Sequence, residues 1–525
     1  MRGFTRKCTL LIAGIAIFAS IPNLATAAPN VDWTQSAKLY EVHTWAGKSD
    51  LGHTDGKTSE ATFFHPHSVV VMPNGQLLIS DSSNQLLRKV SASEVSAYAG
   101  QIVGVDESNL PTGGYNDDEL AHAAFEQPLG LAVDAQGNVY VADSKNNAIR
   151  KVSKDGKVTT LAGNGLIGAS DGVGQKATFF EPSDVAVDAA GKVYVADTLN
   201  NVIRKISPDG TVTTLTAPST RIVEYHPGAV DYVGDFADGA IASAKFNEPS
   251  ALAIDNKGNL YVSDRGNCRI RYIDFNANKV TTVAGSGELA KDAIYVEGGF
   301  VDGDAQQSRF ASPEGLTIAA DGTLIVADSL NHVIRSIKNG KVSTVAGITK
   351  DPGSIDGVAG SAQFNHPTDV AVLSDGRLVI VDEQGNKVRV LQSYTKPTDL
   401  PTDKGIQTLL RGKRVVSDVP AQMKSNSVLL PVNAVGTALG YTVDYDPKSK
   451  SAILTKGELT YVIGPNTKTV TKTLKGKSEQ LTLNAPSLIV NNRMFIPVRF
   501  FATEENLDIQ WDSAAQIVVI RDRTF

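Results

Sequence analysis

The sequence predicts a mainly β protein that is built from one repeated unit. Short runs rich in Val, Ile and Leu recur along the chain, and residues 125–163 contain four of them. Turn sequences that contain Gly separate these runs, so each unit is expected to form four antiparallel strands. The unit occurs six times. Because one small sheet cannot bury its apolar faces alone, we expect six such sheets to pack in a ring as a β-propeller.

A Phe that lies three residues before a Pro marks the start of each unit. The pairs are Phe63/Pro66, Phe125/Pro128, Phe179/Pro182, Phe246/Pro249, Phe310/Pro313 and Phe364/Pro367. An acidic residue lies eight positions before each Phe, and we interpret it as part of a turn that directs the chain into the next sheet. These residues are Asp55, Asp117, Asp171, Asp238, Asp302 and Asp356.

Each unit also has an Asp at the end of its second strand and an Arg seven residues later. The pairs are Asp81/Arg88, Asp143/Arg150, Asp197/Arg204, Asp264/Arg271, Asp328/Arg335 and Asp382/Arg389. Six identical pairs cannot all serve one active site. We therefore interpret them as structural, with the Asp accepting hydrogen bonds from turn amides and pairing with the Arg of its own sheet.

The motif VYVADTLNNVIRKISPDGTVTTL at residues 193–215 closely resembles the NHL repeat family, and the resemblance covers residues 41–392. It implies a six-bladed propeller. It does not imply one activity, because propellers of this type include lyases, lactonases and binding modules, and function has to be argued from sites.

The two ends of the repeat region are predicted to meet. Residues 41–47, EVHTWAG, match the fourth strand of the other units, but no first three strands precede them. The sixth unit has no fourth strand after Leu391. We therefore expect the N-terminal strand to complete blade six and to close the ring, which removes an exposed sheet edge.

Residues 1–27 have the features of a secretory signal peptide. Arg2, Arg6 and Lys7 precede an apolar run over residues 8–21, and the small-residue site Ala-Thr-Ala follows at residues 25–27. The run is shorter than the roughly 20 residues of a membrane span. We expect a secreted or envelope-associated protein with no transmembrane segment in the mature chain. Its one remaining thiol is Cys268, which excludes an intramolecular disulfide.

Charge differs between the two halves of the chain. The net charge is −6 overall, +3 in the signal segment and +5 in residues 401–525, which leaves −14 for residues 28–400. An acidic propeller argues against a nucleic-acid ligand, because phosphate contacts need a basic surface.

Residues 28–392 are thus assigned to the propeller, and the polar, Pro-containing residues 393–404 to a linker. Residues 405–525 form a second, α+β domain with an internal duplication. VLLPVNAVGTALGYTVDYD at residues 428–446 returns as MFIPVRFFATEENLDIQWD at residues 494–512, which places Pro431 over Pro497 and Tyr445 over Trp511. Each half is predicted to be a strand, a short helix and a hairpin.

This duplicated pattern resembles the copper amine oxidase N-terminal-like domain of bacterial surface proteins. The resemblance implies a stalk or attachment module in the cell envelope, of a kind common in Gram-positive bacteria. No His follows His366, so we expect neither copper nor another cofactor here. The excess of basic residues suggests anionic cell-wall polymers as a partner, with a solvated hairpin loop as the alternative. The basic stretch contains Lys468, Lys472, Lys475 and Lys477.

Two features break the repeat and are candidate binding sites. The loops before blades two, four and five are long, and they carry aromatic residues in a chain that is only 6% aromatic. These loops should share one face with the turns between second and third strands. Their rings either bind a ligand or fasten the loops to the rim. The residues are Tyr115, Tyr225, His226, Tyr232, Phe236, Tyr295 and Phe300.

The position before the blade Pro also varies, and we expect it to surround the mouth of the central channel. It holds His65, Gln127, Glu181, Glu248, Ser312 and His366, with His67, Asp184 and Asp369 nearby in sequence. A His and carboxylate metal site is one interpretation, and polar caps on the first strands are the other.

The sequence nominates no nucleophile, because it contains no G-x-S-x-G, phosphate loop or paired CxxC motif. We expect a binding protein whose protein or glycan ligand occupies the propeller face with the long loops. The alternative is a lyase or hydrolase that uses a metal at the channel mouth. The two hypotheses differ in whether the aromatic residues or the histidines matter.

Overall fold

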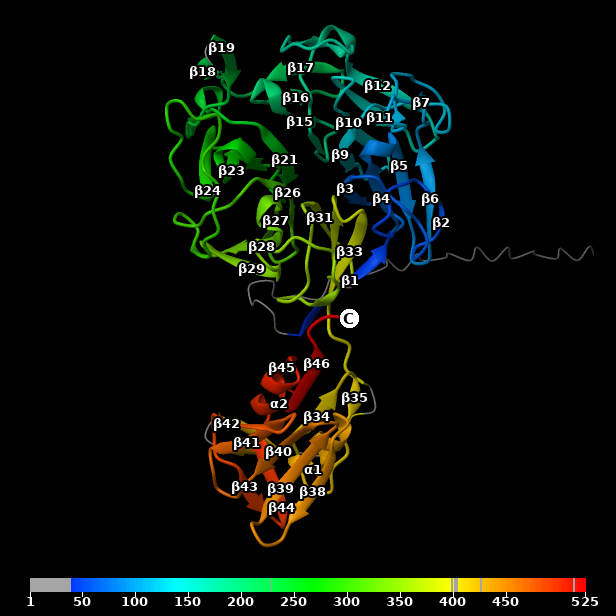
Figure 1. The fold of residues 1–525 in the computed structure, drawn as a ribbon. Helices are drawn as coiled ribbons and strands as arrows, with labels where there is room; N and C mark the ends of the chain where they lie inside the picture. The colour runs from blue at the N-terminus through cyan, green and yellow to red at the C-terminus, as the bar shows by residue number, and fades with distance from the viewer. Residues whose placement is uncertain (1–38, 227, 398–399, 401–404, 425–426, 513–514) are drawn as a thin grey trace, which may run out of the picture.

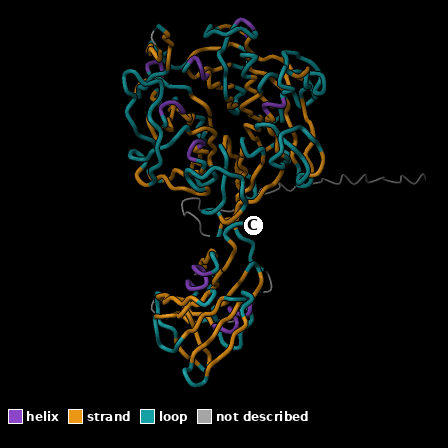
Figure 2. Tube along the Cα trace, in the orientation of Figure 1, coloured by secondary structure: helices purple, strands orange, loops and turns teal. Residues whose placement is uncertain are grey.

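The computed structural model describes residues 39–226, 228–397, 400, 405–424, 427–512 and 515–525. They form a ring of small sheets and a separate, smaller domain below it (Figure 1). Strands dominate both parts, and helices are few and short (Figure 2). No helix in the described ranges has the length and hydropathy that crossing a membrane requires. The predicted signal peptide lies outside these residues.

The ring has six blades, and each blade contains four main antiparallel strands. The innermost strands are β3 (Pro66–Val71), β9 (Pro128–Val133), β14 (Asp184–Val187), β21 (Pro249–Ile254), β26 (Pro313–Ile318) and β31 (Pro367–Val372). The second strands are β4 (Leu77–Asp81), β10 (Val139–Asp143), β15 (Val193–Asp197), β22 (Leu260–Asp264), β27 (Leu324–Asp328) and β32 (Leu378–Asp382). The third strands are β5 (Leu86–Val90), β11 (Ala148–Val152), β16 (Val202–Ile206), β23 (Arg269–Asp274), β28 (Val333–Lys338) and β33 (Lys387–Ser393).

The fourth strands confirm the predicted ring closure. They are β6 (Glu94–Ala99), β12 (Val158–Gly163), β17 (Thr211–Thr214), β24 (Lys279–Ala284), β29 (Lys341–Gly347) and, in blade six, β1 (Tyr40–Ala46). β1 pairs antiparallel with β33, with Val42 opposite Leu391. Five blades gain a two-residue edge strand from the segment after the acidic turn residue. These edge strands are β2 (Gly56–Lys57), β13 (Gly172–Val173), β20 (Gly239–Ala240), β25 (Gly303–Asp304) and β30 (Gly357–Val358).

Each repeated Arg is fully buried inside its blade. Arg204 is typical: one nitrogen lies 2.7 Å from Asp197 and the other 2.9 Å from the turn residue Asp171. The guanidinium also lies over the Phe179 ring, 5.1 Å from its centroid. Oδ1 of Asp197 accepts the backbone N–H of Phe180. The Asp, the Arg, the Phe and the turn Asp of a repeat are thus one network, and it joins the strands of a blade to the chain that enters it.

This network differs from the sequence interpretation, which paired each Arg only with the Asp of the second strand. Every Arg binds the turn Asp as well, because a guanidinium offers several donors in a fixed fork. Arg88 lies 2.8 Å from Asp81 and 2.6 Å from Asp55. Arg389 lies 2.8 Å from Asp382 and 2.6 Å from Asp356.

Burial also decides what the six arginines can do. Their side chains are 0% exposed, so they are core residues of the blades and cannot contact a ligand at the surface. This holds for Arg88, Arg150, Arg204, Arg271, Arg335 and Arg389. Their partners on the second strands are equally buried, namely Asp81, Asp143, Asp197, Asp264, Asp328 and Asp382.

Short 3₁₀ turns connect many of the strands. They are η1 (Ser82–Asn84), η2 (Gly174–Lys176), η3 (Thr198–Asn200), η4 (Ile241–Ser243), η5 (Arg265–Asn267) and η6 (Ser329–Asn331). The long loops before blades two and four contain hairpins of their own, β7 (Gly104–Val105) with β8 (Pro111–Thr112), and β18 (Arg221–His226) with β19 (Ala229–Val233).

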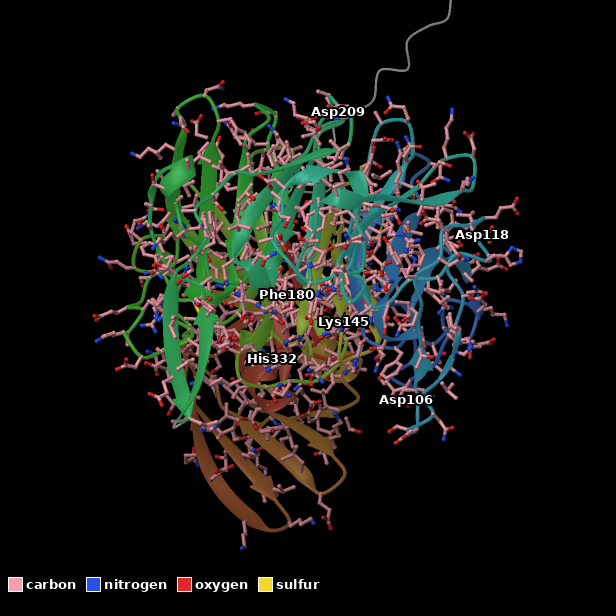
Figure 3. The ribbon with its side chains drawn as sticks, turned by 90° about the horizontal axis from the view of Figure 1, so that it is seen from above. Asp106, Asp118, Lys145, Phe180, Asp209 and His332 are labelled. Carbon is pink, nitrogen blue, oxygen red and sulfur yellow. The ribbon has the colours of Figure 1, made fainter. Side chains whose placement is uncertain are left out.

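The long loops lie on the expected face of the propeller. The loop before blade two contacts the turn between second and third strands of blade one, where the Gln85 amide donates to the Pro111 carbonyl. In Figure 3, Asp106 of this loop lies on the same side as Lys145 and His332, whereas Asp209 of a third-to-fourth strand turn lies on the opposite side. We call the side of Lys145 and His332 the insertion face.

The second domain contains the duplicated units that the sequence predicts. The first half is β37 (Ser427–Pro431), α1 (Val432–Ala438), β38 (Thr442–Asp446) and β39 (Ser451–Lys456), and the second is β44 (Arg493–Pro497), α2 (Arg499–Glu504), β45 (Leu507–Asp512) and β46 (Ile517–Asp522). The remaining strands are β34 (Gln407–Leu410), β35 (Lys413–Arg414), β36 (Gln422–Lys424), β40 (Leu459–Ile463), β41 (Thr469–Leu474), β42 (Lys477–Thr482) and β43 (Leu488–Val490).

The second domain contacts the edge of blade six through the end of the chain. Thr524 bridges to Gly357 of β30, and the Phe525 N–H donates to the Asp356 carbonyl. Arg521, which is 3% exposed, lies 3.1 Å from Glu41 of β1 and 2.6 Å from Asp508. The closing strand of the ring is therefore also the docking edge for the second domain.

Candidate functional site

A small cavity lies in the central channel, and repeat positions of the inner strands line it. The residue directly after each blade Pro contributes His67, Leu129, Ser183, Ser250, Glu314 and Thr368. The next residue contributes Ser68, Gly130, Asp184, Ala251, Gly315 and Asp369. Both sets differ from blade to blade, so the wall of this cavity has no sixfold symmetry.

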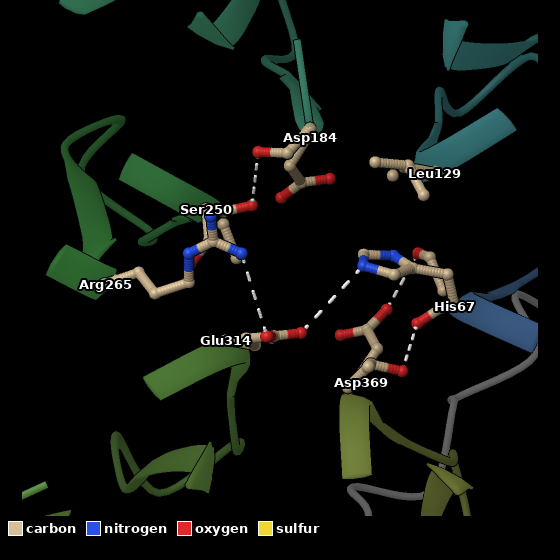
Figure 4. A pocket seen from close by; sticks show the side chains of 13 residues that line it. His67, Leu129, Asp184, Ser250, Arg265, Glu314 and Asp369 are labelled. Atoms are coloured by element: carbon tan, nitrogen blue, oxygen red, sulfur yellow. Dashed lines mark hydrogen bonds and ion pairs between the residues drawn. The ribbon is translucent and has the colours of Figure 1, made fainter. Parts of the chain in front are cut away.

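Asp184 and Asp369 face this cavity from opposite blades, three and six (Figure 4). Asp184 accepts the Leu252 N–H of the next blade at 2.8 Å, and Asp369 accepts the Val69 N–H at 2.9 Å. A glycine stands beside each carboxylate, and a side chain there would clash. A Cβ on Gly130 would lie 2.1 Å from an oxygen of Asp184.

Both of these carboxyls have a raised pKa. Burial raises the pKa of Asp369 to about 6. Burial, followed by the charge of Asp369, raises the pKa of Asp184 well above its ordinary value. The channel therefore holds at least one neutral carboxyl group over part of the physiological pH range, and that group can donate a proton or a hydrogen bond.

Arg265 of η5 extends over the same cavity and is held by carboxylates (Figure 4). It forms an ion pair with Glu248 and lies 3.9 Å from Glu314. Glu314 is only 6% exposed and is also 3.9 Å from His67. Because both separations exceed hydrogen-bonding distance, Glu314 retains acceptor capacity toward a ligand in the cavity.

A second pocket lies between blades four and five and shares Arg265 with the first. Its wall is largely apolar and includes Cys268, Val296 and Leu330. Tyr295, from the long loop before blade five, donates from its hydroxyl to Glu248 at 2.7 Å. Burial and this hydrogen bond raise the pKa of Tyr295 to about 12, so the hydroxyl remains a donor. Burial also raises the pKa of the Cys268 thiol.

The two long loops that border this pocket are joined to each other. The Arg221 guanidinium, at the start of β18, donates to the carbonyls of Ala293 at 2.6 Å and Ile294 at 3.2 Å. This contact connects the β18–β19 hairpin to the loop that carries Tyr295. The rim between blades four and five is therefore one continuous wall, built from two insertions.

The seven aromatic and histidine candidates of the long loops occupy different places. Tyr115, Phe236 and Phe300 lie beside the blade arginines, with Arg150, Arg271 and Arg335 at 5.0, 4.6 and 4.7 Å from the ring centroids. These contacts fasten the loops to the rim. Tyr232 is 73% exposed on β19, and His226 is exposed at the end of β18. The side chain of Tyr225 is outside the described part. Of the six candidates whose side chains the structure describes, only Tyr295 lines the pocket.

The arginines of the blades with short loops pack on the repeated Phe of their own blade. Arg88 lies 5.3 Å from the centroid of the Phe63 ring, and Arg389 lies 5.3 Å from that of Phe364. Every blade thus has an Arg packed on its own Phe, and each long loop adds a second aromatic side chain to that Arg. The repeated Asp and Arg residues are therefore part of the scaffold, and the pockets are lined by other positions.

The residue before each blade Pro does not line the channel cavity, whereas the residues after the Pro do. All six have positive φ, between 45° and 61°. Their backbone N–H groups link neighbouring blades, as in Glu181 to Asn147 and His65 to Asn386. Of this set, Glu248 and Ser312 line the pocket between blades four and five, whereas His67, just after the Pro, lines the channel.

The candidate histidines are paired locally. Nδ1 of His366 lies 2.7 Å from Glu383, and this contact raises the pKa of His366 against the effect of burial. Nδ1 of His65 lies 3.3 Å from the Ser83 hydroxyl. Glu181 pairs instead with Lys145 at 2.6 Å. Within the described residues, no three His, Cys, Asp or Glu side chains converge as a metal ion would require.

The sequence interpretation missed Arg265 and Glu314. Both residues stand at repeat positions whose residue type varies between blades, and this variation is visible in the sequence. The residue after the second-strand Asp is Ser or Thr in four blades, but it is Arg265 in blade four and Glu383 in blade six. The residue after the blade Pro is equally irregular. Comparing these positions across the repeat would have selected the channel mouth.

Comparison with known protein families identifies both parts of the chain. The NHL repeat family matches residues 125–152 and 246–271, and the copper amine oxidase N-terminal domain family matches residues 409–520. The chain thus contains NHL repeats and a C-terminal copper amine oxidase N-terminal domain.

Curated relatives share the repeat region. The chain is 29% identical over 288 residues to Protein SUPPRESSOR OF QUENCHING 1, chloroplastic, of Arabidopsis thaliana, which is 53% of this chain and 26% of that protein. It is 27% identical over 329 residues to NHL repeat-containing protein 2 of Homo sapiens, which is 58% of this chain and 42% of that protein. The chain thus spans less than half the length of these relatives.

Solved structures with a similar arrangement have low identity. An auxiliary nutrient binding protein from Bacteroides ovatus is 18% identical with a TM-score of 0.48, and the match covers 68% of this chain and 77% of that one. A virginiamycin B lyase from Staphylococcus aureus is 12% identical with a TM-score of 0.40, and the match covers 67% of this chain and 99% of that one. At TM-scores below 0.5, these similarities do not indicate a function for this chain.

Proposed function

We propose that this NHL-repeat protein binds a small ligand on the insertion face, where the channel cavity and the pocket between blades four and five meet at Arg265. The observation that carries the proposal is the shared wall. Arg265 lines both spaces, and both are formed by the positions that break the sixfold repeat. A ligand without sixfold symmetry can be recognised only by such positions.

The chemistry of the two spaces indicates an amphiphilic ligand with a cationic or hydrogen-bond-donating head. The channel cavity offers hydrogen-bond acceptors in Glu314 and Asp369. The pocket between blades four and five offers the apolar side chains of Val296 and Leu330. An acidic propeller, with −14 in residues 28–400, would also attract cations.

We also propose that the protein is exported and that its C-terminal domain is a stalk or attachment module. The N-terminal sequence features support export, and the chain-end contacts with blade six support a fixed stalk. Fractionation of the native host tests the localisation, because an exported protein should be recovered from the medium or envelope with residues 1–27 removed.

The binding proposal is tested with a thermal-shift screen of primary amines, amino alcohols and guanidines, followed by titration calorimetry of compounds that raise the melting temperature. Glu314→Gln keeps the shape of Glu314 and removes its charge. Since hydrogen bonds to charged groups contribute about 1.5–3 kcal/mol, affinity should fall roughly tenfold to a hundredfold. Leu330→Ala should lower the affinity for the same compounds, because it removes an apolar contact in the pocket between blades four and five.

Lys145→Ala is the matched control, because it breaks a similar ion pair between blades two and three, away from both pockets. It should leave affinity unchanged. If no compound raises the melting temperature, or if Glu314→Gln binds as tightly as the wild type, the proposed site is wrong.

A further inference from the structure

The two halves of the C-terminal domain are related by an approximate twofold axis. β37 and β44 are equivalent strands, 66 residues apart in sequence, and they pair antiparallel. Leu430 lies opposite Ile496, which is its own counterpart in the duplication. Equivalent strands that pair in this register place the axis between these two residues. Any surface feature of one half should therefore recur on the other.

Two grooves follow this symmetry. In the first groove, residues 431–433 and 443–445 of one half face residues 493–494 of the other, with Asp418 at the rim. In the second groove, residues 497–499 and 509–511 face residues 427–428, with Asn484 at the rim. Every one of these positions in one groove has its counterpart 66 residues away in the other.

Each groove combines one large aromatic ring with short polar side chains. Tyr445 is 54% exposed in the first groove, beside Asn433 and Asp444. Trp511 occupies the equivalent place in the second, beside Arg499 and Gln510, and is partly packed against the core. The surrounding residue types have changed since the duplication, whereas the ring position is aromatic in both halves.

The rims are held by polar contacts that differ between the grooves. In the first groove, Arg493 lies 2.5 Å from Asp418. In the second, the Asn484 amide donates to the Ser427 hydroxyl at 3.0 Å. Both grooves thus have an ordered polar rim around an aromatic wall, and neither has the uniform positive charge that a polyanion requires.

We propose that the twin grooves bind a linear polysaccharide, with one sugar residue packed on each aromatic ring. A pyranose ring presents an apolar C–H face that suits Tyr and Trp, and hydroxyls that both donate and accept hydrogen bonds. Asn and Gln amides also do both, and Asp accepts. A polymer offers the same unit many times, so two equivalent grooves would strengthen attachment through effective concentration. This inference concerns a different part of the chain from the ligand site of the propeller.

Basic residues on the nearby hairpin suggest a different partner, an anionic polymer. The structure places Lys472 on β41, where it lies 2.9 Å from Glu504 and 3.5 Å from Glu479. These contacts partly neutralise the charge of the hairpin, which favours the grooves over the lysines as the binding surface. Salt should weaken binding of a polyanion by the lysines but not binding of a glycan by the grooves, and the experiment uses that difference.

The test is a pull-down of the full-length protein on insoluble cellulose, chitin and peptidoglycan, at low salt and in about 0.5 M sodium chloride, where the Debye length is about 4 Å. The wild type should be retained on at least one of these glycans in both salts. Tyr445→Ala in the first groove and Arg499→Ala in the second should each weaken retention about fivefold or more, and the double variant more strongly. Arg499→Ala is used because it leaves the packed Trp511 in place.

Leu474→Ala is the matched control, since Leu474 is an exposed apolar residue of the same domain that lines neither groove. It should bind as the wild type does, and all variants should keep the melting temperature of the wild type. Three outcomes would overturn the proposal: no retention on any of the three glycans, retention that disappears in high salt, or retention that survives the double variant.

Discussion

Individual residues of this propeller fall into two groups, one structural and one variable. The Asp, Arg and Phe of every blade are buried and serve the sheet. The two residues that follow the blade Pro differ from blade to blade and line the channel. Asp184 and Asp369 are the clearest examples, because these two partly buried carboxyls line one cavity (Figure 4).

The raised pKa of Asp184 predicts a specific pH dependence of stability. A carboxyl whose pKa is higher in the folded state than the ordinary 3.8 stabilises the fold while it is protonated. That contribution is lost as the pH rises through the folded pKa values, which are about 6 for Asp369 and higher than its ordinary value for Asp184.

Asp184→Asn should therefore be more stable than the wild type at pH 8, by a few degrees in melting temperature. The amide oxygen can still accept the Leu252 N–H. At pH 5 the difference should shrink. Thermal denaturation between pH 5 and pH 8 measures it, and a variant that is less stable at pH 8 would show that the carboxylate form is the favoured one.

The buried arginines predict a large effect of a single substitution. Arg204→Met removes the partner of Asp197, which is fully buried, and leaves an uncompensated carboxylate. Breaking a buried pair in this way costs about 3–5 kcal/mol of unfolding free energy. Urea denaturation should show this loss. The double variant Arg204→Met/Asp197→Asn should recover part of it, and no recovery would indicate that the packing of Arg204 on Phe179 matters more than its charge.

Among the structural elements, the blade is the unit of stability and β1 is its least local member. β1 pairs with β33, more than 300 residues away in sequence, and also with the edge strand β30. Val42 is fully buried in the core of blade six. The fourth strands of the other five blades each follow the third strand of their own blade.

Removing β1 should open the ring. A chain that lacks residues 28–47 leaves β33 with an unpaired edge, so we expect a lower melting temperature or aggregation during purification. A chain that lacks only residues 28–38 is the control, because it retains the whole of β1. Equal melting curves for the two truncations would contradict the role of β1 in closure.

In the protein as a whole, blade six is the part of the propeller that contacts the second domain. The chain ends beside the strand that closes the ring, and Arg521 joins Glu41 and Asp508 across the boundary. Ring closure and domain docking therefore depend on the same sheet edge. This arrangement places the second domain below blade six (Figure 1).

Gly357→Val should separate the domains without unfolding either one. A Cβ at this position would lie 2.3 Å from the Arg523 carbonyl oxygen, so the end of the chain could not dock. We expect small-angle X-ray scattering to show a larger radius of gyration. Thr524→Ala is the control, because it alters a side chain at the same contact and keeps the backbone bridge to Gly357. An unchanged scattering curve for Gly357→Val would show that docking does not need this contact.

The repeat architecture could be predicted from the amino-acid order, because it depends on short-range patterns. Strand runs, turn glycines and the recurring Asp and Arg are all visible within one unit, and six copies repeat the same signal. Closure by residues 41–47 was predictable for the same reason, since a fourth strand is recognisable without its neighbours. The duplication of the second domain was equally plain in the spacing of Pro431 and Pro497.

Which variable positions meet depends instead on how the blades pack in three dimensions. Arg265, Glu314 and Tyr295 come from three segments, and the distances between them are set by neighbouring blades. The residues before each Pro have positive φ, and it is the residues after the Pro that line the channel cavity. Likewise, the pairing of Leu430 with Ile496 brought the aromatic ring of one half to the strand of the other. Sequence spacing fixes neighbours along a chain, whereas these sites are built between elements whose packing geometry no local pattern encodes.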